Sequence, residues 1–381
     1  MTSLIERIRE IFQPSTPEPL KAGFITYHTP ADQAEQYRLH LRVENDGEGL
    51  MIVNASSVLH LNRTATEFAW HLMHGATIHE ASKKMARRFD APSTQLEEDL
   101  RQFQKKIHLF ITQPDQDPTA DLGFEPHELN GDISAPFRLD CCLTYRQEEA
   151  AQKPTEAEGE LDSTAWKAII SKAYNAGIPH LVFLGGEATQ REDLIALLSE
   201  AETLGLVTGL VSSGSRLEDV AFVQQMITSG LDHLIFRLDP ANEAQVQTLL
   251  RILPLDLFIC VDISVSEGFP LRDLINQLKS AGANAFALHP AQGSTENTLV
   301  EALAALTEAE VKIIHDNPQP LVSPALLKAA GETGNQVSPY ARLLILPDGT
   351  VLPGNGAGAP LGNLATEAWE AVWNRREFLA L

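Results

Sequence analysis

Cysteine is scarce in this 381-residue sequence, and positive charge is in short supply. The three cysteines, Cys141, Cys142 and Cys260, are too few for a disulfide framework and suit a reducing compartment. Arginine and lysine number 29 against 51 aspartates and glutamates, which gives a formal net charge of −22. Because a polyanion repels phosphate backbones and anionic lipid, nucleic acid and membrane surfaces are poor partners.

Long apolar runs are absent as well. No stretch stays apolar for the ~18 residues that a membrane-spanning helix needs. Residues 1–13 mix apolar side chains with Glu6, Arg7, Arg9 and Glu10. That pattern indicates a short amphipathic helix and not a secretion signal. We therefore expect a cytoplasmic protein.

The sequence does contain enough apolar material for two globular domains, since 44% of its residues are hydrophobic and 21% are charged. Near the N-terminus, strand-like segments precede three helical patterns. The strands are expected at residues 23–28, 37–43, 50–53 and 57–61. Thr64 and Thr77 begin the first two helices, each with a glutamate three residues later. The third helix opens at Pro92 and has an apolar stripe of Leu96, Leu100, Phe103 and Ile107.

A second pattern begins at Phe137, where apolar runs alternate with helical segments. The runs cover residues 137–143, 181–184, 206–211, 233–238, 257–265, 285–288 and 311–315. The helices are expected at 164–176, 192–204, 217–227, 243–252, 271–281 and 295–306. Continuous apolar strands that alternate with helices predict a parallel sheet covered by helices. Six or seven such units favour a partial or complete TIM-like (β/α) barrel, with an open doubly wound sheet as the alternative.

These patterns divide the chain into five parts. An N-terminal helix and proline-rich spacer (1–21) lead into a winged-helix-like α+β domain (22–112). A proline-rich, acidic linker follows (113–135). The α/β barrel is expected over 136–335, and a small extension over 336–381. In the extension, a hairpin turns at Pro347-Asp348-Gly349, and Thr366 caps a last helix with Trp369 and Trp373 on one face.

The loop after the second barrel strand is the candidate ligand site, because parallel barrels bind ligands at the C-terminal ends of their strands. It reads Gly185-Gly186-Glu187. Two glycines let a ligand approach the backbone closely, and the carboxylate beside them can hold an ammonium group. The alternative is that Glu187 caps the helix that follows. Ser212 and Ser213 end the next strand, where serines also serve as caps.

Several segments resemble radical S-adenosylmethionine enzymes. The stretch 183–189 resembles their Gly-Gly-Glu-Pro motif, with Ala188 at the proline position. The resemblance implies that Gly185, Gly186 and Glu187 bind the methionyl part of S-adenosylmethionine, with Ser212 and Ser213 near the nucleoside. Further segments resemble the family's fourth strand (231–239), its auxiliary-cluster, SPASM-like C-terminal extension (346–369), and PqqD-like peptide-recognition domains (61–80).

The chain departs from this family at the iron–sulfur cluster. The first strand aligns with the strand that precedes the family's Cys-x-x-x-Cys-x-x-Cys motif, but the three ligand positions hold Gln147, Ala151 and Pro154. Iron–sulfur clusters need thiolates or, rarely, imidazoles. The four-iron cluster that the resemblance implies therefore lacks its ligands. Gly354 stands where the C-terminal extension usually has a cysteine.

The cysteines that are present do not replace these ligands. Cys141 and Cys142 are neighbours in a strand, so they are expected on opposite faces, where they cannot share a cluster. Cys260 lies inside the apolar run of the fifth strand. We interpret all three as small buried hydrophobic residues.

The resemblance predicts a degenerate radical S-adenosylmethionine-like protein of the peptide-modification type. Active members use S-adenosylmethionine and a four-iron cluster to modify a precursor peptide. This chain is expected to keep a peptide site and an S-adenosylmethionine-type ligand site without the cluster. Two alternatives stay open: a barrel enzyme with another cofactor, a metal or a cluster held by a partner's ligands, and a non-catalytic peptide-binding or scaffold protein. The sequence does not decide whether the chain is an enzyme.

Peptide capture is expected in the domain at 22–112. An exposed strand edge beside an amphipathic helix can accept an extended peptide as an added strand. Gln102, Lys105 and Lys106 on the third helix would meet an acidic leader peptide. The acidic run at 97–99 on the same helix disfavours DNA binding. A simple packing or dimerisation module is the alternative.

Polar residues end further barrel strands. Arg237 ends the fourth, where we expect a salt bridge with Glu187 or Asp239. The others are His289, His315 and Asp316. Such a set could hold a metal in a non-radical barrel hydrolase. No close His-x-His spacing supports that function, so satisfied or exposed histidines are the favoured interpretation.

Overall fold

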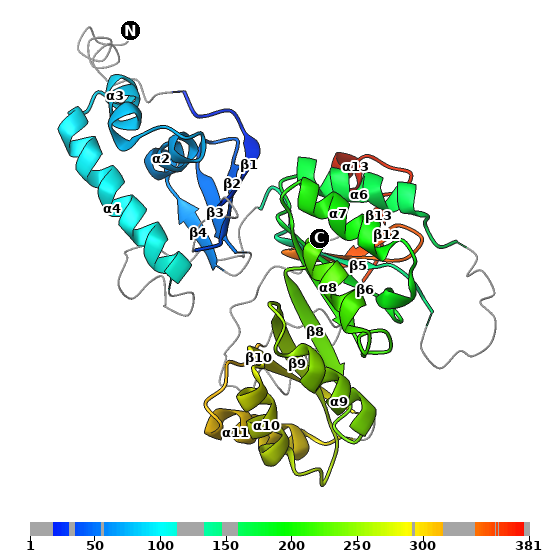
Figure 1. The fold of residues 1–381 in the computed structure, drawn as a ribbon. Coiled ribbons are helices and arrows are strands. Elements are labelled where there is room, and N and C mark those ends of the chain that lie inside the picture. The colour runs from blue at the N-terminus through cyan, green and yellow to red at the C-terminus, as the bar shows by residue number, and fades with distance from the viewer. Residues whose placement is uncertain are drawn as a thin grey trace, which may run out of the picture. The chain divides into compact units, whose positions relative to one another are not determined.

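The computed structural model describes residues 18–29, 35–54, 57–112, 133–146, 159–291, 294–314, 340–354, 356 and 358–376. The chain divides into two compact units, residues 1–127 and 128–381 (Figure 1). The helix expected at 1–13 and most of the linker expected at 113–135 lie outside the described residues. Among the described helices, none is long and apolar enough to cross a membrane.

The first unit is a four-stranded antiparallel sheet followed by three helices. The strands β1 (Gly23–His28), β2 (Arg38–Val43), β3 (Gly49–Val53) and β4 (Ser57–Leu61) pair in chain order, so β1 and β4 are the edges of this sheet. The helices are α2 (Arg63–Met73), α3 (Ile78–Phe89) and α4 (Ser93–Thr112). The four strands and three helices lie where the sequence periodicity predicted them.

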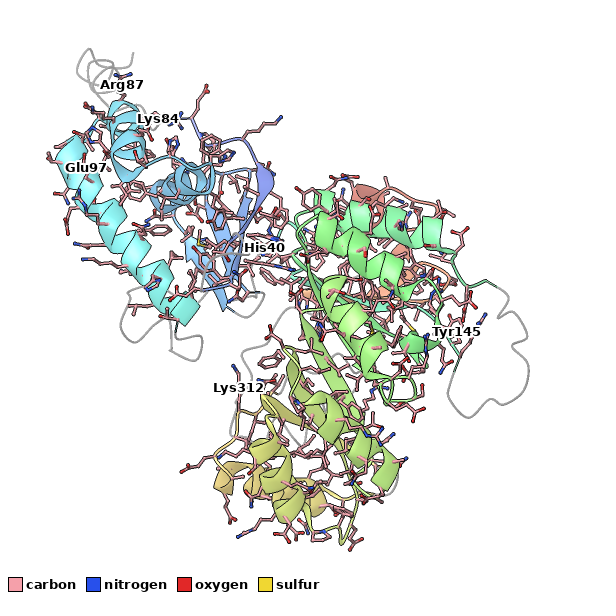
Figure 2. The ribbon with its side chains drawn as sticks, in the orientation of Figure 1. His40, Lys84, Arg87, Glu97, Tyr145 and Lys312 are labelled. Carbon is pink, nitrogen blue, oxygen red and sulfur yellow. The ribbon has the colours of Figure 1, made fainter. Side chains whose placement is uncertain are left out.

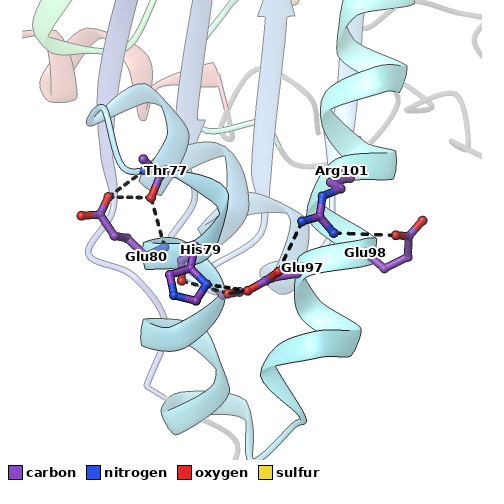
Figure 3. A network of polar contacts seen from close by, with 7 residues as sticks. Thr77, His79, Glu80, Glu97, Glu98 and Arg101 are labelled. Carbon is purple, nitrogen blue, oxygen red and sulfur yellow. Dashed lines mark hydrogen bonds and ion pairs between the residues drawn. The ribbon is translucent and has the colours of Figure 1, made fainter.

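The helix starts of this unit show which caps were predicted correctly. Asn62, not Thr64, caps α2, because its side chain accepts a hydrogen bond from the Ala65 amide at 3.0 Å. The prediction for Thr64 was wrong because a stronger cap residue stands two positions earlier. The capping box of Thr77 and Glu80 on α3 is confirmed, with the Thr77 amide 2.9 Å from Glu80 Oε2 (Figure 3).

A polar network connects α3 with α4. His79 Nδ1 lies 2.7 Å from Glu97 Oε1, and Arg101 approaches both Glu97 and Glu98 (Figure 3). Beneath this network lies the predicted apolar stripe of α4: Leu96, Leu100, Phe103 and Ile107 are all buried. They share one core with Leu59 and Leu61 of β4. The edge strand β4 and the helix α4 are therefore packed into the same core.

The second unit is built on a nine-stranded sheet. Its order is β10-β9-β8-β7-β6-β5-β11-β12-β13, and β5 to β10 run parallel in sequence order. These six strands are β5 (Arg138–Cys142), β6 (His180–Leu184), β7 (Val207–Ser212), β8 (His233–Leu238), β9 (Phe258–Val265) and β10 (Ala285–Pro290). The connecting helices are α6 (Ser163–Asn175), α7 (Leu194–Thr203), α8 (Val220–Thr228), α9 (Glu243–Ile252), α10 (Leu271–Ala281) and α11 (Glu296–Glu308).

The two faces of this sheet differ. One face packs in a large core with residues from every connecting helix, such as Trp166, Leu197 and Leu249. The opposite face carries a smaller apolar cluster that includes Val211, Ile235 and Cys260 from β7, β8 and β9. A doubly wound sheet reverses its strand order and carries helices on both faces. The observed order has no reversal, so the sheet is singly wound. We call the face of the smaller cluster the inner face.

A closed barrel is not formed by the described residues, because β10 and β13 remain the edges of the sheet. The strand expected at 311–315 appears only as an isolated bridge between Ile313 and Phe286. Its expected last residue, His315, lies outside the described residues. The parallel α/β sheet is thus confirmed, and the complete barrel is not.

The C-terminal extension joins the same sheet. The strands β11 (Arg342–Ile345) and β12 (Thr350–Pro353) form the predicted hairpin, and β11 pairs in parallel with β5. The short strand β13 (Gly362–Asn363) and the helix α13 (Trp369–Trp373) follow. The stacked rings of Trp369 and Trp373 lie 5.6 Å apart. The cap position of α13 is Ala368, so the prediction that Thr366 caps this helix was wrong.

Candidate functional site

The two glycines after β6 lie against the backbone that leaves β5. The Gly186 amide donates to Thr144 O at 2.9 Å, and the Glu187 amide donates to Arg146 O at 2.7 Å. A Cβ on Gly186 would stand only 1.9 Å from Arg146 O, and Gly185 has a φ of +150°. Glycine is therefore required at both positions by the neighbouring backbone itself, and not only by the approach of a ligand.

Glu187 and the two serines predicted beside it come together. The Glu187 carboxylate is 1% exposed and accepts five hydrogen bonds. Its Oε1 accepts from the Thr189 amide at 3.2 Å, the Thr189 hydroxyl at 2.5 Å and the Ser212 hydroxyl at 2.8 Å. Its Oε2 accepts from the Ser213 amide at 3.0 Å and the Ser213 hydroxyl at 2.9 Å. This saturated carboxylate joins the loop after β6 to the end of β7.

The contacts of Glu187 match the cap that the sequence offered as an alternative to ligand binding. The side chain bonds the Thr189 amide and so caps the short 3-10 turn at Ala188–Gln190. An ionised carboxylate has room for about four hydrogen bonds. With five donors around it, Glu187 has no open lone pair aimed at a ligand.

A second carboxylate on the inner face lies in a different environment. Asp262 of β9 is 0% exposed, and neither of its oxygens has a hydrogen-bond partner among the described residues. Arg237 of β8 is its partner in the strand register, and the Arg237 Nε also lacks a hydrogen bond within the described part of the chain. His289 of β10 places Nδ1 3.0 Å from Asp262 Oδ1, an ion pair when the ring is protonated but not a hydrogen bond.

Burial and charge act against each other in this cluster of Arg237, Asp262 and His289. Burial lowers the pKa of the Arg237 guanidinium, while the charges of Asp262 and Glu187 raise it. The predicted salt bridge of Arg237 with Glu187 or Asp239 is not the pairing found. Asp239 instead accepts a hydrogen bond from the Ala241 amide. The register partner of Arg237 is Asp262.

The sequence analysis missed Asp262. It lies in the middle of an apolar run, Phe258–Val265, which was read as a fully buried strand. Its signal was strand alternation: Cys260 is on the inner face, so Asp262, two residues on, shares that face. A lone carboxylate on an otherwise apolar strand face marks a site that the apolar run alone does not explain.

Cys141 and Cys260 are buried as predicted, and Cys142 is only half-buried. Cys141 packs in the large core, and Cys142 packs against the cluster on the inner face, so the two point to opposite faces of β5. Burial raises the pKa of the Cys142 thiol to about 11. The positions Gln147, Ala151 and Pro154 lie outside the described residues, as do His315 and Asp316. In the part of the chain that is described, no three His, Cys, Asp or Glu side chains gather into a metal site.

Comparison with known proteins begins with the first unit. The sequence model of the family described as coenzyme PQQ synthesis protein D (PqqD) matches residues 49–108. Residues 49–108 form a PqqD domain. It spans β3, β4, α2, α3 and most of α4. The edge strand and the helix that share one core thus both belong to the PqqD domain.

Curated relatives point the same way. The PqqA peptide cyclase of Rhizobium meliloti (strain 1021) is 38% identical over 80 residues, which are 21% of this chain and 21% of that protein. The PqqA peptide cyclase of Gluconobacter oxydans (strain 621H) is 31% identical over 122 residues, covering 30% of this chain and 34% of that protein. The matches thus span about a fifth to a third of these two relatives.

Among solved structures, Streptococcus suis SuiB bound to S-adenosylmethionine shares the fold, with a TM-score of 0.57 and 14% identity over 85% of this chain and 84% of SuiB. SuiB has also been solved bound to its precursor peptide SuiA, with a TM-score of 0.56. Together with the PqqD domain and the PqqA peptide cyclases, this fold confirms the resemblance to radical S-adenosylmethionine peptide-modification proteins.

Proposed function

We propose that this chain captures a precursor-type peptide through its PqqD domain, on a radical S-adenosylmethionine scaffold that has lost its four-iron cluster. The observation that carries the proposal is the PqqD domain itself, with the edge strand β4 packed into one core with α4. An edge strand offers backbone groups to an extended peptide, and the adjacent helix offers side chains.

Basic side chains in the C-terminal half of α4 fit an acidic peptide. Gln102 and Lys105 are exposed on α4, and Lys106 is half-buried beside them. A further basic group on α3 comprises Lys83, Lys84 and Arg87, all of them exposed; Figure 2 shows Lys84 and Arg87 projecting from that helix. In a chain of net charge −22, Lys105 and Lys106 are a local exception to the general repulsion of anions, and the group on α3 lies on another helix and provides a control.

The loss of the cluster is supported by the donor chemistry. The motif positions hold an amide, a methyl group and a proline ring, and none of them is a thiolate. The thiol of Cys142, with its raised pKa of about 11, is protonated at neutral pH. Gly354 leaves no room for a ligand, because a Cβ there would stand 2.6 Å from Arg342 O. The residues present therefore do not fit a four-iron cluster.

The inner face of the sheet is the proposed place for a small molecule of the S-adenosylmethionine type. Gly185, Gly186 and Glu187 with Ser212 and Ser213 would form its rim at the C-terminal ends of β6 and β7. Support comes from the position of this loop at strand ends, where parallel α/β sheets bind their ligands. We propose that this site binds a ligand without catalysing a reaction.

Fluorescence anisotropy of the full chain tests peptide capture, with labelled peptides encoded beside the gene as probes. We expect Lys105→Glu with Lys106→Glu to weaken binding of an acidic peptide about tenfold, because two attractions become repulsions. The matched control is Lys83→Glu with Lys84→Glu, which makes the same charge change on α3 and should alter the affinity less than about threefold.

Equal losses from the two double variants would show a non-specific charge effect and contradict docking along β4 and α4. Iron analysis after anaerobic reconstitution tests the other half of the proposal. A stoichiometric cluster that survives gel filtration would show that the scaffold has kept its cluster through other ligands.

A further inference from the structure

Two buried carboxylates belong to the parallel sheet, Glu187 directly after β6 and Asp262 within β9, and their surroundings differ. Glu187 is surrounded by five donors from Thr189, Ser212 and Ser213. Asp262 is equally buried, and both of its oxygens lack a hydrogen bond among the described residues. Burying a carboxylate without hydrogen-bond donors costs free energy. Such a carboxylate is therefore expected where a ligand supplies the donors.

The residues around Asp262 limit which ligand can supply these donors. The Arg237 Nε is a buried donor without an acceptor within the described part of the chain. His289 approaches Asp262 from the next strand, and its side chain is 25% exposed. The rest of the inner face nearby is apolar, with Ile235, Cys260 and Ala287. The two open acceptors of Asp262 thus stand beside the open Nε donor of Arg237 and the ring of His289, with apolar residues around them.

We propose that Asp262 and Arg237 bind the head group of an α-amino acid, with its ammonium on Asp262 and its carboxylate on Arg237. Register partners on neighbouring strands stand about 5 Å apart, a spacing that lets one such head group contact both side chains. Neither a bare amine nor a bare carboxylate satisfies both oxygens of Asp262 and the Nε of Arg237. The inference deepens the proposed small-molecule site and assigns its ligand-facing carboxylate to Asp262 in place of Glu187.

The inference differs from the expectation based on resemblance. There, the carboxylate after the two glycines holds the amino group of the ligand. Here, that carboxylate is saturated by its own loop and by the end of β7, and the open acceptor lies on β9, three strands further along the sheet than β6. Small residues lie on the same face beside it, Ala285 and Ala287 of β10, and the His289 side chain next to Asp262 is 25% exposed.

Isothermal titration calorimetry on the full chain tests this assignment. The probes are L-methionine, S-adenosylhomocysteine and 5′-methylthioadenosine, of which only the last lacks the amino-acid head group. We expect the first two to bind, and 5′-methylthioadenosine to bind at least tenfold more weakly than S-adenosylhomocysteine, because Asp262 and Arg237 then have no partner.

Variants separate the two carboxylates. Asp262→Asn and Arg237→Gln should each weaken S-adenosylhomocysteine binding at least tenfold. The matched control is Asp239→Asn, which removes an exposed carboxylate directly after β8. It should change the affinity for S-adenosylhomocysteine less than twofold. Because Asp262→Asn is nearly isosteric, its circular dichroism spectrum should match the wild type. Arg237→Gln serves as the second variant if Asp262→Asn does not fold.

Three results would overturn the inference. They are the absence of binding by both amino-acid probes, equal affinity of wild type and Asp262→Asn, and loss of binding in Glu187→Gln with Asp262→Asn unaffected. Each leaves peptide capture untouched, because the anisotropy measurement reports on the PqqD domain. Conversely, failure of peptide capture leaves the calorimetric result standing.

Discussion

Glu187 and Asp262 carry the same charge, are both buried, and lie on the same parallel sheet, yet they have opposite surroundings. Glu187 is held by five hydrogen bonds from groups on two segments, while Asp262 lacks any among the described residues. The first carboxylate is part of what holds the strand ends together. We expect the second to contribute little to the free energy of unfolding. Resemblance to a family motif pointed to the first, and the contacts point to the second.

The largest expected effect concerns the saturated carboxylate. Glu187→Leu leaves two amides, of Thr189 and Ser213, and three hydroxyls, of Thr189, Ser212 and Ser213, without their acceptor in a buried setting. We expect a loss of about 4 kcal/mol of the free energy of unfolding, measured by urea denaturation. Ser213→Ala removes only one hydroxyl and should cost about 1 kcal/mol. A loss below about 1 kcal/mol in Glu187→Leu would mean that these contacts do not hold the strand ends together.

A half-buried histidine at the N-terminal end of β8 provides the next test. His233 packs so closely on Gly209 that a Cβ there would stand 2.2 Å from its Nε2. Burial, with a smaller contribution from Arg138, lowers the His233 pKa from 6.5 to about 4. The unfolded chain therefore binds a proton between these pH values and the folded chain does not. The contribution of His233 to the free energy of unfolding is fully present above about pH 6.5 and is lost as the pH falls towards 4.

The size of this loss follows from the shift. The difference of 6.5 − 4 = 2.5 pKa units corresponds to about 3 kcal/mol at 1.36 kcal/mol per unit. Urea denaturation at pH 7 and pH 4.5 measures it. In His233→Gln the difference between the two pH values should shrink by most of that amount. An unchanged difference would assign the acid sensitivity to other groups.

The smallest effect is expected at the open carboxylate. Asp262→Asn should change the free energy of unfolding by less than about 1 kcal/mol, because no hydrogen bond among the described residues is lost and a buried charge is removed. Thermal and urea denaturation without added ligand measure this change. A loss as large as that of Glu187→Leu would make Asp262 a structural residue and would remove the contrast between the two carboxylates.

Much of the fold could be predicted from the sequence because it depends on local periodicity. The limits of β8 and α9 coincide with the predicted segments 233–238 and 243–252. The apolar stripe of α4 was also read correctly from its spacing. Cap positions were less predictable, since Asn62 and Thr64 compete within one turn and the difference is small.

The site was predicted in part. Strand-end position brought Gly185, Glu187, Ser212 and Ser213 together correctly. The saturation of Glu187 was not visible, because three of its five donors come from Ser212 and Ser213, 25 and 26 positions away. Whether Asp262 has a hydrogen-bond partner depends on side chains of the two neighbouring strands, β8 and β10. The sequence of β9 alone does not contain this information. Long-range partners, and not local pattern, separate the two carboxylates.

The pairing of β11 with β5 has a consequence for the order of synthesis. Arg138 and Arg342 face each other in this pair, 342 − 138 = 204 residues apart in the chain. At about 5 to 20 residues per second on a ribosome, β5 emerges about 10 to 40 s before its partner. During that interval one edge of β5 is unpaired, the kind of exposed strand that invites aggregation. A nascent chain that stalls before Arg342 is therefore expected to need chaperone protection at this edge.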